Sequence, residues 1–303
     1  MDYKKILEDI YAEVKPLLNK GKVADYIPAL SQVPIDKYGI VVRLNSGEEF
    51  CFGDYEENFS IQSISKLLTL TMAHTANTQI LNKFVGVEPS GNPFNSLVQL
   101  EYEDGIPRNP FINAGALVIT DNLISLNPDA KCQILNTFRD LSGNNNIQVD
   151  PVVEKSEQEH GYRNLALVNF MKSFGNIKND VNKVVDVYFN HCSIAMNCLD
   201  LARTFSFLSN GGKSTTGETI TTVSQTKRIN SIMLTCGTYD AVGKFVFEVG
   251  LPAKSGVGGG IVAVIPNQMT IAVWSPGLDK TGNSLVGTKA LELFTTYCGN
   301  SIF

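Results

Sequence analysis

Residues 59–70 read Phe59-Ser60-Ile61-Gln62-Ser63-Ile64-Ser65-Lys66-Leu67-Leu68-Thr69-Leu70, and this stretch decides the fold. Its apolar residues surround a predicted helix, which is typical of a helix buried on most sides. Ser63 and Lys66 are three residues apart and therefore share one helix face. Burial favours the neutral amine of lysine, which can take the proton of a neighbouring serine hydroxyl and so make a nucleophile. The stretch predicts a Ser-x-x-Lys catalytic pair.

The Ser-x-x-Lys spacing alone is weak evidence, because ordinary residue frequencies produce it about once in a chain of this length. A second copy is present, from Ser224 to Lys227. That copy lies in the polar run 221–230, where nothing would desolvate its lysine. We therefore look for companion motifs before assigning a role to Ser63 and Lys66.

Composition predicts an ordinary globular protein. The chain has 303 residues, of which 43% are hydrophobic, so it can bury a large core in one domain or two lobes. A net charge of −5 argues against a nucleic-acid surface, which needs clustered Lys and Arg. No apolar run approaches the ~18 residues of a spanning helix, and residues 1–10 lack the apolar core of a signal peptide. We expect a cytoplasmic protein with no membrane or nucleic-acid partner.

Neither the cysteines nor the histidines predict a metal or redox site. The cysteines include no Cys-x-x-Cys pair and no zinc-ligand spacing, which is typical of buried thiols in a reducing compartment. The histidines are scattered and form no His-Glu-x-x-His motif. The sequence therefore predicts no metal site and no cofactor. The residues concerned are Cys51, Cys132, Cys192, Cys198, Cys236, Cys298, His74, His160 and His191.

Hydrophobic periodicity predicts strands near both chain ends and helices between them. We expect helices over 6–18, 195–208 and 284–298, a mainly helical region over 63–210, and strands over 38–44, 49–53, 245–249, 260–265 and 269–274. Short connections make the sheet mainly antiparallel. The fold class is therefore α/β (α+β), with a sheet built from both chain ends and an inserted helical lobe. The single domain 1–303 would divide into a sheet lobe, 1–62 plus 222–303, and a helical lobe, 63–221.

A second motif, Lys254-Ser255-Gly256, directly precedes the expected strand at 260–265. In serine acyl-transfer enzymes of the penicillin-recognising type, such a triplet lines the cleft opposite the Ser-x-x-Lys helix. Glycine permits close backbone approach, so the N–H groups of Ser63 and Val257 would form an oxyanion hole. The two motifs together predict a serine acyl-transferase with a β-lactamase/transpeptidase-like fold. The Ser-Asp-Asn motif of β-lactamases is absent, which argues against a lactam substrate.

A longer ordered set of motifs resembles one family, the serine-dependent glutaminases of bacteria and animals. The match covers most of the chain and adds Gly21-Lys22-Val23-Ala24-Asp25-Tyr26-Ile27-Pro28-Ala29-Leu30, Val87-Glu88-Pro89-Ser90-Gly91, Asn109-Pro110-Phe111-Ile112-Asn113-Ala114-Gly115-Ala116, Ser156-Glu157 with Arg163-Asn164, Tyr188 with Cys192-Ser193, Cys236-Gly237-Thr238-Tyr239-Asp240, and Lys254-Ser255-Gly256-Val257-Gly258-Gly259-Gly260. The resemblance implies a β-lactamase-like fold, L-glutamine as substrate, and a homodimer or homotetramer. It also implies the catalytic residues Ser63, Lys66 and Tyr239 and a substrate site of Ser63, Asn113, Glu157, Asn164, Tyr188, Tyr239 and Val257.

The chemistry of glutamine agrees with these implied residues. Its α-ammonium needs a carboxylate, for which Glu157 is the candidate. Its α-carboxylate needs neutral donors, which Asn113, Asn164 and Tyr188 can provide. The side-chain amide would then reach Ser63, whose attack gives a glutamyl ester and ammonia before water completes the hydrolysis.

Simpler structural roles exist for several of these residues. Asn113 could cap a helix, and Glu157 could be a first-turn acid favoured by the helix dipole. Tyr188 and Tyr239 could be core aromatics whose hydroxyls find partners. For the whole chain, the alternatives are another serine acyl-transferase of the β-lactamase or penicillin-binding type and a non-catalytic scaffold. Whether Lys66 or Tyr239 takes the serine proton is open, as are the pH optimum, phosphate activation and inhibition by glutamate.

The segment 21–30 is expected to lie at the entrance of the site. Gly21 and Pro28 bracket it with one flexible and one rigid joint, and loops held over a scaffold commonly carry function. We expect Tyr26 to act as a lid that points its ring into the mouth of the site. The alternative is a connector in which Tyr26 and Ile27 only pack against the rest of the chain.

Overall fold

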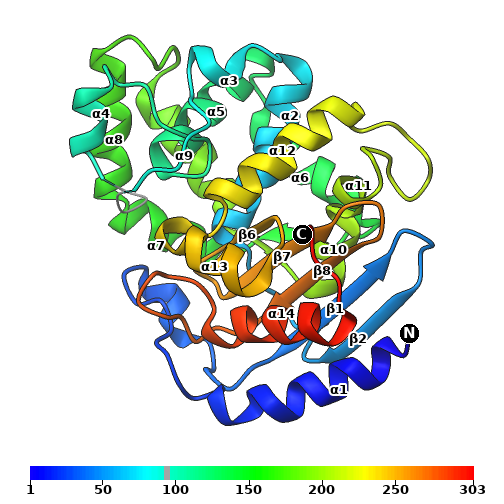
Figure 1. Ribbon diagram of the computed structural model, residues 1–303. Helices are drawn as coiled ribbons and strands as arrows, with labels where there is room; N and C mark the ends of the chain where they lie inside the picture. The colour runs from blue at the N-terminus through cyan, green and yellow to red at the C-terminus, as the bar shows by residue number, and fades with distance from the viewer. Residues whose placement is uncertain (92–95) are drawn as a thin grey trace.

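An antiparallel sheet built from both ends of the chain forms the centre of the fold (Figure 1). The computed structural model describes residues 1–91 and 96–303, and within them this sheet has five strands in the order β2-β1-β8-β7-β6. The strands are β1 (Gly39–Leu44), β2 (Glu49–Gly53), β6 (Ala253–Ser255), β7 (Gly260–Ile265) and β8 (Met269–Trp274). Because β1 pairs along its length with β8, the predicted sheet from both chain ends is confirmed.

Side chains alternate across this sheet and divide the hydrophobic core in two. Ile40 and Val42 of β1 face α1 (Tyr3–Val14), α13 (Val242–Val249) and α14 (Leu285–Cys298). Val41, between them, faces the helical part of the chain. The two-residue period of a strand explains this alternation. Helices cover both faces, so every residue of β7 and β8 is buried.

The helical part packs around α2 (Ser65–Ala76), which is buried on nearly all sides. Its apolar residues, including Leu67 and Leu70, share one core with the surrounding helices, as the sequence predicts. Those helices are α5 (Asn113–Leu126), α6 (Ala130–Ser142), α8 (Tyr162–Ser173), α9 (Val181–Cys192) and α12 (Val223–Cys236). Shorter or more peripheral helices are α3 (Ile80–Lys83), α4 (Val98–Tyr102), α7 (Pro151–His160), α10 (Cys198–Thr204) and α11 (Ser206–Ser209).

The prediction of a strand over 245–249 is wrong, because these residues form the end of α13. Phe245 and Val249 are buried, whereas Phe247 is 90% exposed. A strand would have placed all three on one face, but helical spacing turns Phe247 to the outside. Gly250, with φ 67°, ends this helix in the left-handed conformation that glycine accepts without steric cost.

The prediction of one helix over 195–208 is also wrong in part. Residues 194–196 form β5 (Ile194–Met196), which pairs with β3 (Phe59–Ser60) and β4 (Gln148–Val149) in a small second sheet. Asn197 then caps α10 by accepting a hydrogen bond from the Asp200 N–H at 2.8 Å. Because β3 leads directly into Ser63, this small sheet fixes where the Ser63 segment begins.

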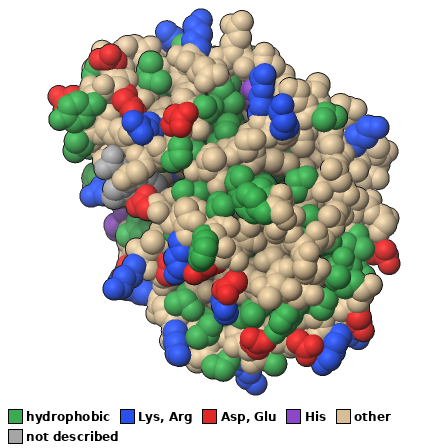
Figure 2. Space-filling view, viewed as in Figure 1, with side chains coloured by type: hydrophobic (Ala, Val, Ile, Leu, Met, Phe, Trp, Pro, Cys, Tyr) green, Lys and Arg blue, Asp and Glu red, His purple; other side chains and the backbone are tan. Residues whose placement is uncertain are grey.

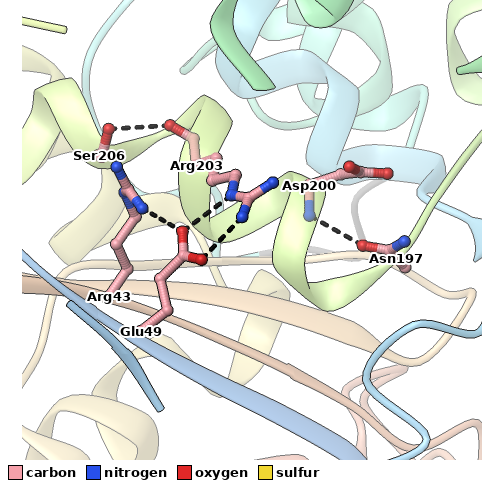
Figure 3. Close-up of polar contacts among 6 residues, drawn as sticks. All are labelled: Arg43, Glu49, Asn197, Asp200, Arg203 and Ser206. Carbon is pink, nitrogen blue, oxygen red and sulfur yellow. Dashed lines mark hydrogen bonds and ion pairs between the residues drawn. The ribbon is translucent and has the colours of Figure 1, made fainter. Parts of the chain in front are cut away.

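A cluster of charged side chains joins the edge of the large sheet to α10 (Figure 3). Glu49 on β2 accepts two hydrogen bonds from Arg203, each of 2.8 Å, and also pairs with Arg43. Arg43 is 9% exposed and the Glu49 side chain 19% exposed, so this pair is largely removed from water. Bidentate arginine–carboxylate pairs combine strength with fixed geometry. The cluster therefore holds α10 against the sheet.

The molecular surface carries mixed charge. On the face in Figure 2, basic and acidic side chains are interspersed. Among the described residues, no helix is both long and apolar enough to cross a membrane.

Arg203→Met should lower the free energy of unfolding by about 1–3 kcal/mol at neutral pH, because it leaves the largely buried Glu49 without its bidentate partner. Arg203 holds the pKa of Glu49 below its usual value of 4.5. The stability that this pair contributes is therefore present above that pH and is lost as the pH falls below it. Urea unfolding at several pH values measures the difference.

Lys289→Met is the matched control, since it breaks the Lys289–Glu292 pair, whose side chains are 40% and 30% exposed. It should cost about 0–1 kcal/mol. Equal losses in the two variants, or a loss for Arg203→Met that persists unchanged in acid, would contradict the role of the cluster.

Candidate active site

Ser63 lies on a short 3-10 turn, Gln62–Ile64, between β3 and α2. The α-helix itself begins at Ser65, so Ser63 precedes the first regular turn of the predicted helix. Ser63 is 8% exposed, and the preceding Gln62 has a φ of 48°, a left-handed conformation that is uncommon for residues other than glycine. Such backbone conformations persist where the surroundings impose them, often at functional sites.

Lys66 is fully buried one turn beyond Ser63. Its Nζ donates to the carbonyl oxygen of Phe111 at 3.2 Å and to Oδ1 of Asn113 at 2.7 Å. Burial lowers the pKa of Lys66 to about 8, although the charges of Cys192 and Glu157 oppose this shift. Lys66 therefore reaches the neutral amine at a much lower pH than an exposed lysine does.

Val257 lies opposite this segment because the glycines on either side of it press against the backbone before Ser63. A Cβ at Gly256 would lie 2.5 Å from the carbonyl oxygen of Ile61, and one at Gly258 only 2.1 Å from that of Ser60. Glycine is thus required at both positions for the close approach. The Gly258 carbonyl also accepts a 3.0 Å hydrogen bond from the indole N–H of Trp274.

Tyr239 lies between Ser63 and Lys254. A hydrogen bond joins its side chain to Ser63, and its hydroxyl donates to the carbonyl oxygen of Ser255 at 3.3 Å. Burial raises the pKa of Tyr239 well above its usual value, and the bond to Ser63 opposes that rise. With a φ of 55°, Tyr239 is the second non-glycine residue of this region in the left-handed conformation.

A cavity of about 320 Å³ opens beside these residues. Asn113, Glu157 and Asn164 line it together with Tyr26. The Asn113 amide donates to Oδ1 of Asn164 at 2.9 Å, so both amides are held in place. This volume is at the lower end of the range of small-molecule sites. Three of the four residues predicted to hold the head of an amino acid therefore line one cavity, whereas Tyr188 does not line it.

Glu157 is the buried carboxyl of this cavity, with 5% of the residue exposed. Burial raises its pKa to about 7, while a hydrogen bond from Gln62 and the charge of Lys66 oppose the rise. Tyr188, 4% exposed, lies in the same interior, with its ring centroid 5.8 Å from Lys66 Nζ. Burial raises the pKa of Tyr188, and Cys192 and Glu157 add to that rise.

Two bridges connect the cavity to Ser63 and Lys66. Gln62, the residue directly before Ser63, is hydrogen-bonded to Glu157, and Asn113 joins the cavity wall to Lys66. Sequence reasoning missed Gln62, whose only signal was its polarity within an apolar stretch. The second Ser-x-x-Lys copy lies apart from this group, with Ser224 and Lys227 exposed on α12.

Two other features of the described residues bear on the choice of site. A separate cavity of about 400 Å³ between α12 and the β7–β8 turn contains none of the candidate residues. In the part of the chain that the structure describes, no cluster of three His, Cys, Asp or Glu side chains could hold a metal ion. The group around Ser63 is therefore the candidate active site.

Comparisons with known proteins place the chain in a family. The family model described as Glutaminase matches residues 21–303. The chain belongs to the glutaminase family. The glutaminase of Aliivibrio fischeri strain ES114 is 56% identical over 302 residues, covering 99% of each chain. The solved structure of the probable glutaminase ybaS is 33% identical with a TM-score of 0.94, covering 99% of this chain and 97% of that one.

A second solved structure, a probable glutaminase from Bacillus subtilis complexed with 6-diazo-5-oxo-L-norleucine, is 30% identical with a TM-score of 0.88 and covers 98% of this chain and 96% of that one. Together these matches confirm the family resemblance and the β-lactamase-like glutaminase fold expected from the sequence.

Glu157→Gln should stabilise this glutaminase in the absence of substrate. Since burial raises the pKa of Glu157 from 4.5 to about 7, its ionisation opposes folding increasingly as the pH rises through that interval. Below this pH interval the variant and the wild type should have the same free energy of unfolding. Above it the variant should be more stable, by at most about 3 kcal/mol. Thermal melts across the interval measure this.

Glu159→Gln on the same helix is the control, because the Glu159 side chain is 56% exposed. It should match the wild type at every pH. Loss of stability in Glu157→Gln at alkaline pH would show that the ionised carboxylate is well solvated or paired in the folded protein.

Proposed function

We propose that this glutaminase hydrolyses the side-chain amide of L-glutamine to L-glutamate and ammonia through an acyl-enzyme on Ser63. The observation that carries the proposal is the pair of bridges from the cavity to the catalytic pair, Gln62–Glu157 and Asn113–Lys66. They link a buried carboxyl that suits an ammonium to a buried amine that suits proton transfer. A ligand that carries both an ammonium and a reactive amide fits this arrangement.

The head of glutamine binds in the cavity. Its ammonium pairs with the carboxylate of Glu157, and this charge stabilises the ionised form that burial disfavours. Its carboxylate accepts hydrogen bonds from Asn113, Asn164 and Tyr188. Recognition of both charged groups positions the side chain toward Ser63 and accounts for the choice of a free amino acid as substrate.

The reaction proceeds in two steps, acylation of Ser63 and hydrolysis of the resulting glutamyl ester. The Ser63 hydroxyl adds to the amide carbon while its proton passes to Lys66 and Tyr239, which act as one coupled set. The N–H groups of Ser63 and Val257 stabilise the oxyanion, after which the C–N bond breaks and the leaving nitrogen takes a proton to give ammonia. Water then adds to the glutamyl ester while one of its protons passes through Lys66 and Tyr239 to the Ser63 oxygen, the C–O bond to Ser63 breaks, and glutamate departs.

Two further properties belong to the proposal. The family resemblance supports a homodimer or homotetramer, which light scattering of the purified protein would measure. The composition supports a cytoplasmic protein, which fractionation of the source cells would measure.

Ser63→Ala should lower kcat by about three orders of magnitude or more, as loss of an attacking nucleophile does. The control is Ser224→Ala, which removes the exposed serine of the second Ser-x-x-Lys copy and should retain full activity. Ammonia release from L-glutamine measures both. Normal turnover by Ser63→Ala would exclude the acyl-enzyme mechanism.

The compound bound by the Bacillus subtilis relative gives an independent measurement. In 6-diazo-5-oxo-L-norleucine a diazomethyl ketone replaces the amide of glutamine. Ser63 should therefore displace dinitrogen and become covalently labelled, and mass spectrometry of the wild type should show the mass of the reagent less dinitrogen. Ser63→Ala should remain unlabelled, and labelling elsewhere in that variant would point to a different nucleophile.

Tyr26 supports the lid proposal. The residue is 54% exposed, yet burial of its hydroxyl end and the neighbouring Glu157 raise its pKa well above the usual value. The next residue, Ile27, packs with Tyr239 and Val257 in a small apolar cluster. A tyrosine held this way would close over the head of glutamine while keeping one ring face in water.

Tyr26→Ala should reduce kcat/KM by one to two orders of magnitude, roughly the 1.4–2.8 kcal/mol that gating contacts supply. The melting temperature should hardly change, because more than half of Tyr26 is exposed. Tyr297→Ala, on α14 and 39% exposed, is the control and should keep full activity. If Tyr26→Ala lost stability but kept its catalytic efficiency, the segment would serve packing alone.

A further inference from the structure

Two lysines, Lys66 and Lys254, are fully buried at the candidate active site. Neither forms an ion pair with a carboxylate among the described residues. Both contact Phe111, since Lys66 Nζ donates to its carbonyl oxygen at 3.2 Å and Lys254 Nζ lies 5.6 Å from its ring centroid. The charge of Lys66 acts on Lys254, so two ammonium groups in this interior of low dielectric constant would repel strongly. The two lysines therefore need different protonation states.

The contacts of Lys254 suit an ammonium. Its Nζ donates to the carbonyl oxygens of Gly237, at 2.9 Å, and Ser255. It also lies 4.6 Å from the ring centroid of Tyr239, close enough for a cation–π interaction. Carbonyl oxygens and ring faces all attract positive charge, and none of them can donate a hydrogen bond to the lone pair of a neutral amine.

The contacts of Lys66 suit a neutral amine. Two of its N–H groups are used by Phe111 and Asn113, which is the number that a neutral amine carries. Its lone pair can accept the hydroxyl proton of Ser63, which lies on the 3-10 turn directly before α2. The nearest ring centroid, that of Tyr188, is 5.8 Å away, farther than the ring centroid of Tyr239 is from Lys254.

We propose that Lys254 is the fixed cation of the active site, a positioning residue whose charge keeps Lys66 neutral and whose ammonium holds Tyr239 against Ser63. This proposal rests on the proposed function of Ser63. Lys254 and the Tyr239 hydroxyl both donate to the Ser255 carbonyl, and Lys254 also binds Gly237, two residues before Tyr239. One side chain thus ties the left-handed turn at Tyr239 to strand β6.

Burial lowers the pKa of both lysines, that of Lys66 to about 8 and that of Lys254 well below its usual value, so the contacts of each amine decide which one keeps the proton. Besides burial, the charge of Lys66 lowers the pKa of Lys254, while Cys192 acts in the opposite direction. Repulsion between two lysines is mutual, so the one with the better cation contacts keeps its proton. The titratable groups that face Lys254 are Lys66 on α2, Cys192 on α9 and Tyr239 itself. Pairs of groups whose surroundings push their pKa values apart are a known basis for acid–base assignments.

The first test observes the charge states directly in the wild-type protein. Protein labelled with 13C at the lysine Cε atoms is titrated by NMR, and the two buried resonances are assigned by their loss in Lys66→Arg and Lys254→Arg. The expected result is a Lys66 resonance that titrates to the neutral amine along the rising limb of the activity profile, and a Lys254 resonance of the ammonium throughout the pH range of activity. A neutral Lys254 in that range would overturn the proposal, and this measurement needs no active variant.

The second test separates a charge effect from simple packing. Lys254→Met removes the charge, so Lys66 should lose its proton at higher pH, and the rising limb of the kcat/KM profile should move up by about one pH unit. We expect kcat to fall about 10- to 100-fold while KM stays nearly constant, because Lys254 does not line the head-group cavity. Lys254→Arg keeps the charge and should keep the limb in place.

Lys244→Met is the matched control, since the Lys244 side chain is 75% exposed on α13; its activity and profile should equal those of the wild type. A Lys254→Met enzyme that loses stability and kcat with an unmoved profile would overturn the charge role. Ser63→Ala, measured in parallel, distinguishes the two proposals. If that variant stays active the proposed function fails, whereas if it is inactive and only the lysine results disagree, this inference alone fails.

Discussion

The structure depends on the burial of an amine within the helix that crosses its centre. Lys66 is completely removed from water, and its hydrogen bonds to Phe111 and Asn113 join α2 to the start of α5. These two helices also share the largest apolar core of the chain. A polar group placed so deeply must be satisfied locally or it destabilises the protein. The helical part therefore packs closely around Lys66.

The same burial makes the site a source of instability that the remaining structure must offset. Lys66, Lys254 and Glu157 are all buried. Burial lowers the pKa of the two lysines and raises that of Glu157, so it favours the neutral form of each group. Gln62 and Tyr239 add left-handed backbone conformations. The buried faces of the large sheet, the helices on both sides and the Arg43–Glu49–Arg203 cluster supply the opposing stability. Such a division between a strained site and a well-packed scaffold is common in enzymes.

Much of this arrangement could be predicted from the sequence, because strong patterns carry it. The buried helix and the antiparallel sheet from both chain ends follow from periodicity, and one unexpected lysine in an apolar stretch is the basis of the predicted Ser63–Lys66 pair. The glycines around Val257 are also explained, because the backbone before Ser63 leaves no room for a Cβ at these positions.

The remaining features depend on contacts between distant segments. The strands β3, β4 and β5 are two or three residues long, too short to establish a period. The prediction for residues 245–249 failed because an apolar run of that length fits a strand or a helix. Only the exposure of Phe247 in the structure distinguishes the two. The bond from Gln62 to Glu157 joins residues far apart in the chain, and no local pattern encodes it.

The chain has a single tryptophan, and its position gives the protein a built-in optical probe. Trp274 stacks on Phe59, with ring centroids 4.9 Å apart and planes within 1° of parallel, and its indole N–H binds the Gly258 carbonyl. Phe59 begins the segment that delivers Ser63, and Gly258 adjoins Val257. One chromophore thus contacts both of the segments that meet at the candidate active site. Its emission consequently records small displacements of either segment in stopped-flow experiments without any attached dye.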